Sequence, residues 1–71
     1  MNINAVIAEV FRSAIENPEN IKEDGSVNWD FVEADVLIGV GIDNVIENMG
    51  MSMFFEYFNL LVDVRTQSEV A

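Results

Sequence analysis

Hydrophobic residues recur three and four positions apart over residues 3–16, the spacing that places them on one face of an α-helix. Asn2 precedes this segment and can cap its first turn, because an asparagine oxygen accepts hydrogen bonds from free backbone N–H groups. Pro18 ends it, since proline keeps the preceding residue out of the helical region. We therefore predict an amphipathic helix with the apolar face Ile3, Val6, Ile7, Val10, Phe11, Ala14 and Ile15.

Residues 17–27 mix turn formers with charged residues and predict a loop. Within it, residues 24–28 (Asp-Gly-Ser-Val-Asn) resemble the middle of an EF-hand calcium loop. With Gly25 at the turn position of such a loop, Lys22 and Phe31 would fall where calcium needs oxygen ligands. We therefore predict a plain turn between helices, with no metal site.

Two interpretations compete for the segment that follows. Asn28 can cap a helix, but hydrophobic residues occupy the even positions of residues 32–42, which is typical of a strand. No other segment alternates in this way, so a strand here would have to pair across a subunit interface. We favour a helix that breaks near Gly39 and Gly41.

Two further helices are predicted in the C-terminal part of the chain. Asp43 or Asn44 can begin a short helix that Gly50 ends, and Ser52 can cap the next one. Over residues 53–64 the polar positions form a stripe only about 60° wide on the helical wheel. These positions are Glu56, Asn59 and Asp63.

The helix over residues 53–64 is therefore apolar around most of its circumference. A helix of this kind is buried on more than one side, and a chain of 71 residues has little material to cover it. We predict that it contacts a protein partner, first of all a second copy of the chain. The predicted interface residues are Phe54, Phe55, Phe58, Leu61 and Val62.

Chain length points in the same direction. A domain of this size buries only about 60% of the surface that its unfolded chain exposes, and there is no cysteine to form disulfides. We predict one domain over residues 1–66 and a polar, frayed tail over residues 67–71. The predicted fold class is all-α, with three to four short helices completed by homo-oligomerisation. The alternative is an α+β fold in which residues 32–42 form a strand paired across a dimer.

Charge narrows the choice of partners. Thirteen acidic residues against three basic ones give a formal net charge of −10, which repels nucleic-acid phosphates and anionic lipid headgroups. The longest apolar runs, residues 36–42 and 49–55, are far shorter than the roughly 20 residues that span a bilayer. Residues 1–4 contain no basic residue of the kind that begins a secretory signal. We expect no direct nucleic-acid or membrane binding and a cytoplasmic location.

The residue types give no indication of catalysis. Without cysteine or histidine, the chain has none of the usual ligands of zinc, haem or iron–sulfur clusters and no imidazole base for its serines. Carboxylate pairs such as Glu23 and Asp24 would need a pocket that separates their pKa values before they could act as acid and base. We predict a non-enzymatic protein without catalytic residues, metal or cofactor.

Residues 17–36, with the central sequence Asp-Gly-Ser-Val-Asn-Trp at 24–29, resemble small uncharacterised proteins of tailed phages that infect cyanobacteria. The resemblance implies a phage origin and a host cytoplasm. Two functional hypotheses follow. The first is a self-associating protein–protein interaction module, a homodimer. The second is a nucleic-acid mimic whose negative charge inhibits a basic host protein that binds DNA or RNA, which would require carboxylates in rows at phosphate-like separations.

Overall fold

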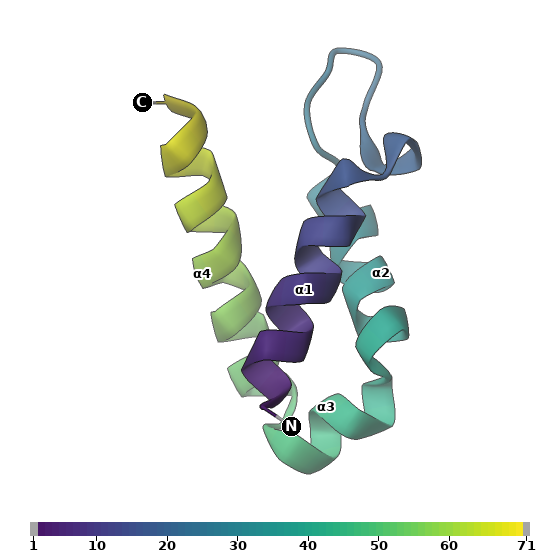
Figure 1. Ribbon diagram of the computed structural model, residues 1–71, viewed down its shortest axis with the longest axis vertical. Helices are drawn as coiled ribbons and strands as arrows, with labels where there is room; N and C mark the ends of the chain where they lie inside the picture. Colours follow the sequence, from purple (N-terminus) through teal and green to yellow (C-terminus); the bar gives the residue numbers. More distant parts are fainter. Residues whose placement is uncertain (1, 71) are drawn as a thin grey trace.

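The computed structural model describes the backbone of residues 2–70 and the side chains of residues 2–67, and its elements are arranged as shown in Figure 1. This part of the chain consists of four α-helices and one short 3₁₀ helix, joined by turns. In chain order they are α1 (Ile3–Glu16), η1 (Pro18–Asn20), α2 (Trp29–Val40), α3 (Ile42–Asn48) and α4 (Met51–Val70).

The all-α prediction is confirmed, and the α+β alternative is wrong. Residues 32–40 lie in α2, and the described residues contain no strand, only an isolated antiparallel bridge between Ile21 and Val27. Alternation favoured the strand interpretation because Val32, Val36 and Val40 are all even-numbered, but these three also recur every fourth residue. In the helix they form one buried stripe.

Helix α1 begins and ends as predicted. The Asn2 side chain accepts a hydrogen bond from the Asn4 N–H at 2.9 Å and so caps the first turn. At the other end Asn17 adopts an extended conformation immediately before Pro18. Helix α2 likewise starts after Asn28, whose side chain accepts a hydrogen bond from a backbone N–H of the first turn.

Helices α1 and α2 pack closely because a glycine lies where they meet. A methyl group on Gly39 would lie 2.7 Å from Cγ1 of Val10, nearer than carbon atoms can approach. The sequence suggested that Gly39 would help to break α2, but the helix continues through it. The break falls at Gly41 alone, where a φ of 97° ends α2 at Val40.

Glycines also set the starts of the last two helices. Helix α3 begins at Ile42 with Gly41 as its N-cap, so the predicted start at Asp43 or Asn44 is slightly late. The Asn44 side chain instead donates a hydrogen bond to the Val40 carbonyl at 2.9 Å and ties the two helices together.

The predicted cap of α4 is also wrong. The helix begins at Met51, so Ser52 lies inside its first turn. The carbonyl of Gly50 accepts the N–H of Phe54 at 3.1 Å, which makes Gly50 the residue that precedes the helix. With its φ of 82°, Gly50 turns the chain out of α3 and directly into α4.

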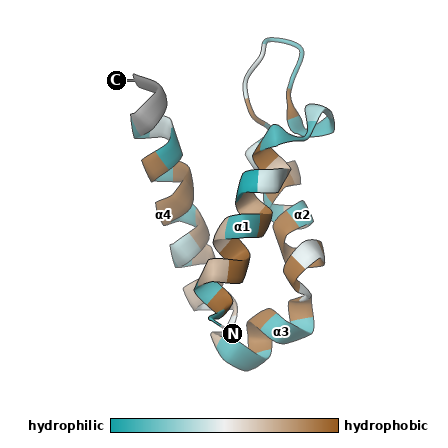
Figure 2. Cartoon of the chain, viewed as in Figure 1, coloured by the Kyte–Doolittle hydropathy of each residue, from teal (hydrophilic) through white to brown (hydrophobic). Residues whose placement is uncertain are grey.

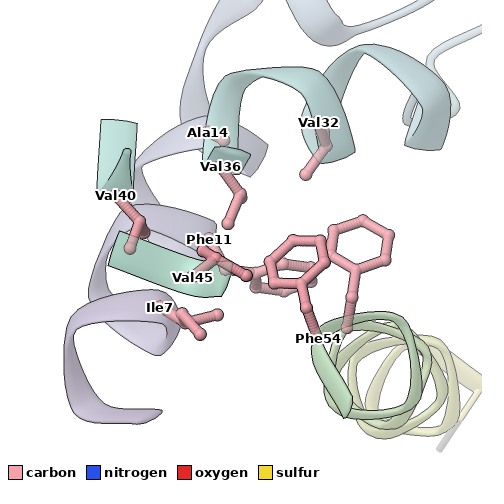
Figure 3. Close-up of a cluster of buried hydrophobic side chains, with 9 residues drawn as sticks. Ile7, Phe11, Ala14, Val32, Val36, Val40, Val45 and Phe54 are labelled. Atoms are coloured by element: carbon pink, nitrogen blue, oxygen red, sulfur yellow. The ribbon is translucent and has the colours of Figure 1, made fainter. Parts of the chain in front are cut away.

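All four helices contribute to a single core, shown in Figure 3. The ring of Phe11 lies nearly parallel to that of Trp29, with centroids 6.0 Å apart, and meets Phe58 edge-on at 5.6 Å. Phe54 projects from α4 toward the valines of α2. The buried hydrophobic residues are Ile7, Phe11, Ala14, Val32, Val36, Val40, Val45, Phe54 and Phe58.

One buried polar side chain fastens the loop between α1 and α2. Asn20 donates from Nδ2 to the Ala14 carbonyl at 2.9 Å and to Oδ2 of Asp35 at 2.7 Å. The backbone carbonyl of Asn20 accepts a hydrogen bond from the Asn28 N–H at 2.8 Å. Asn20 thus joins the end of α1, the start of α2 and the middle of α2, a role that the sequence did not reveal.

Helix α4 leaves the rest of the molecule after Val62, and Figure 1 shows it diverging from α1. All described residues from Asp63 to Gln67 are exposed. The radius of gyration is 12.1 Å, compared with about 11 Å for a compact domain of this length. The backbone is helical through Val70, and the predicted frayed tail over 67–71 falls mostly outside the described side chains and stays a prediction.

We expect Gly39→Ala to lower the free energy of unfolding by about 1–3 kcal/mol, because the added methyl overlaps Val10 in a packed interface. The sign is diagnostic, since alanine in place of glycine otherwise stabilises a helix by up to about 1 kcal/mol. Urea unfolding followed by circular dichroism measures the change. In a Val10→Ala background the same substitution should cost much less, and an undiminished cost would mean that this contact is not its cause.

Asn20→Ala should lower the free energy of unfolding by about 1–3 kcal/mol, because it removes the donor to the Asp35 carboxylate and leaves the Ala14 carbonyl with only the longer bond from the Asn17 N–H. The matched control is Asp35→Asn, which keeps an oxygen acceptor opposite Asn20 and should cost less. Equal losses in thermal and urea unfolding for the two variants would contradict this assignment.

Candidate protein-interaction surface

The five residues predicted to form a partner interface divide into two groups in the structure. Phe54 and Phe58 are buried inside the chain itself, stacked on each other with centroids 6.0 Å apart. They are core residues, because α1 and α2 supply the apolar wall that the sequence suggested a partner would provide. Phe55 is 40% exposed, while Leu61 and Val62 are partly buried against the core.

A different set of α4 side chains is the most exposed. Met53, Leu60 and Val64 are 54%, 55% and 59% exposed, and we call them the outer row. Their spacing of seven and four residues places them on one side of the helix. Figure 2 shows hydrophobic residues continuing along α4 where it diverges from α1. The outer row is therefore an apolar strip that the chain does not cover.

Tyr57 completes the outer row on its inner side. It lies between Met53 and Leu60 in the heptad spacing of four, three and four residues that is typical of helix-pairing seams. Its hydroxyl donates a hydrogen bond to the Asn4 carbonyl at 3.3 Å, which orients the ring toward the start of α1. This spacing is visible in the sequence and marks the outer row. Periodicity alone, however, could not show that the outer row is exposed while Phe54 and Phe58 are buried.

Acidic side chains flank the outer row on its other side. Glu56 and Asp63 are exposed and lie within about 60° of Leu60 on the helical wheel. Arg65 is the one basic residue of α4 through Gln67, and it lies about 140° from Leu60, on the other side of the helix. The strip is thus bordered by negative charge.

A second group of exposed apolar residues surrounds the junction of α2 and α3. Ile38, Ile42 and Ile46 are all exposed, and the last two share one face of α3. Beside this junction is a shallow groove of about 220 Å³, less than the roughly 300 Å³ of the smallest usual ligand sites. The groove is lined by Ile3, Val6, Val40, Asn44 and Asn48, none of which titrates.

The turn that resembled a calcium loop uses its carboxylate internally. Oδ1 of Asp24 accepts hydrogen bonds from the Ser26 hydroxyl at 2.6 Å and from the Ser26 N–H at 2.9 Å. The hydroxyl contact, with the N–H second, lowers the pKa of Asp24. Among the described residues no group of three acidic side chains is placed to hold a metal ion.

Comparison of the chain with known proteins gives no family assignment. The chain matches no protein-family model, no curated protein and no solved structure. Within the described residues, no helix has the length and apolar character needed to cross a bilayer. The exposed apolar strip of α4 is therefore the candidate functional surface.

Ser26→Ala should raise the pKa of Asp24 toward its ordinary value, because it removes the hydroxyl that stabilises the carboxylate. Since folding lowers this pKa, the contribution of Asp24 to stability is present above the unfolded-state pKa and is lost as pH falls through the folded-state value. Side-chain carboxyl chemical shifts followed by NMR measure the titration. Ser13→Ala, an exposed serine on α1, is the control and should leave the Asp24 curve unchanged.

Proposed function

We propose that the chain is a non-enzymatic protein–protein interaction module that pairs with a helix through the outer row of α4. In the isolated protein, the available helix is the α4 of a second copy, so the module self-associates. The observation that carries this proposal is the exposure of Met53, Leu60 and Val64 on a helix whose opposite side is anchored in the core. The resemblance of residues 17–36 to phage proteins supports a host cytoplasm as the setting.

Burial of the outer row provides a moderate driving force. Fully covering a side chain such as leucine, valine or methionine contributes about 1.5–3 kcal/mol, and these three are already about half covered. Two copies together therefore gain roughly 5–9 kcal/mol before the cost of association is subtracted. This range predicts a reversible dimer at high concentration, with a folded monomer below it.

The nucleic-acid mimic is less well supported. Exposed carboxylates occur on each of the four helices, for example Glu9, Asp30, Asp43 and Glu56. A mimic would concentrate them in rows on one face, whereas a spread over all helices is what solvation of a small acidic domain requires. We therefore do not propose mimicry.

Sedimentation equilibrium from micromolar to submillimolar concentration tests the proposal. We expect the average mass to rise from that of a monomer toward that of a dimer. Leu60→Glu with Val64→Glu should keep the protein monomeric throughout, because two new carboxylates in the strip oppose its burial. Both residues are exposed, so the helical circular dichroism should not change.

The matched control is Ile38→Glu, which places a carboxylate in the exposed apolar group at the α2–α3 junction. This variant should associate as the unmodified chain does. Loss of association in Ile38→Glu but not in the α4 variant would move the interface to that junction. A monomer at every concentration would contradict self-association.

A further inference from the structure

We infer that the preferred occupant of the outer row is a basic amphipathic helix of another protein, and that a second copy of the chain is the poorer fit. This inference rests on the proposed function of the same surface. It follows from which charges border the strip, which side of the helix they occupy, and how long the strip is.

The charges that border the outer row favour a basic partner over a second copy. Glu56 and Asp63 lie beside Leu60, where the residues that flank a helix-pairing seam face the partner. A second copy brings the same two carboxylates to the contact in an antiparallel pair, so acid faces acid. Flanking positions of this kind select partners, and like charges there act against the wrong one. A helix with lysine or arginine beside its apolar residues would instead place positive charges opposite Glu56 and Asp63, which attract them.

The net charge of the whole chain also favours a basic partner. Two copies carry ten net negative charges each, which oppose one another as they approach, whereas a basic helix is attracted from a distance. Arg65 does not change this within the strip, because it lies on the side of α4 away from Leu60. A basic partner should therefore associate faster than a second copy, and more slowly as salt is added.

The length and borders of the strip define the size of the helix that fits it. Met53 to Val64 spans about three helical turns, or about 16 Å along the axis. Tyr57, held by Asn4, closes the inner side, and the acidic pair forms the outer side. The matching ligand is a helix of about four turns with apolar residues three and four positions apart and basic residues along one border.

Three synthetic peptides of about five helical turns provide the test, with binding to the full chain followed by anisotropy of a fluorophore on the peptide. The first has leucine at seam positions and lysine at the others. The second has the same composition in scrambled order, and the third has glutamate in place of lysine. We expect the first to bind at least about tenfold more tightly than the other two, and to shift the chain from dimer to a one-to-one complex.

Charge-neutral variants of the chain separate this inference from general attraction. Glu56→Gln with Asp63→Asn should weaken binding of the lysine peptide by roughly two- to tenfold. The same pair should strengthen self-association, because the like charges at that contact are gone. Asp43→Asn with Glu47→Gln changes the net charge equally on α3 and should alter peptide affinity by less than about twofold.

The outcomes distinguish the two proposals. Equal binding of ordered and scrambled lysine peptides, or equal losses in the α4 and α3 variants, would overturn the inference, since attraction would then be to net charge alone. Self-association that requires Leu60, without preference for the lysine peptide, would overturn the inference and leave the proposed function intact. Leu60→Ser with Val64→Ser should weaken both peptide binding and self-association. Undiminished binding of the ordered peptide would overturn the inference, and undiminished self-association of the same variant would overturn the proposed function.

Discussion

A series of aromatic contacts holds the last helix to the rest of the molecule. In the first turns of α4, Phe54 stacks on Phe58, Phe58 meets Phe11 edge-on, and Phe11 in turn stacks on Trp29 at the start of α2. This aromatic group is the contact in which α1, α2 and α4 meet. Because it engages only the first half of α4, the helix has one end fixed in the core and the other directed into solvent. The start of α4 is thus held by the core, whereas its described side chains from Asp63 to Gln67 are all exposed.

The remainder of the core is small, and it suffices because two features bring α1 and α2 into close contact. Gly39 allows Val10 to pack directly on the backbone of α2. Asn20 closes the intervening loop from within and leaves the polar groups it meets satisfied. Among the described side chains, no buried polar atom lacks a hydrogen-bond partner. The stability of this short chain without disulfides therefore depends more on how closely α1 and α2 approach than on the volume of the core.

Local features of the sequence predicted the elements well. Asn2, Pro18 and Asn28 act through groups near them in the chain, so their effects could be read from order alone. Gly50 was correctly predicted to end α3, but the start of α4 was assigned to Ser52. A serine side chain is a recognisable cap, whereas a glycine that precedes a helix has no side chain to indicate its role.

Features that depend on distant parts of the chain could not be predicted. The periodicity of residues 53–64 established which side chains share a face, but not which face α1 and α2 would cover. Phe54 and Phe58 were therefore assigned to a partner, although they belong to the core, and the exposed Leu60 was not among the residues predicted to face one. The role of Asn20 depends on Asp35, fifteen residues away, and no local pattern indicates such a pairing.

The turn between Ile21 and Val27 is complete in itself. The N–H of Lys22 donates to the Ser26 carbonyl at 2.8 Å, and the N–H of Gly25 donates to the Lys22 carbonyl at 2.9 Å. A Cβ atom placed on Gly25 would have no heavy atom beyond its chain neighbours within 4 Å. Extra residues at this tip would displace no neighbour, and the entropy of loop closure grows only slowly with length. The molecule thus has a natural insertion point, where a reporter peptide or a second domain could be carried while the helices remain as they are.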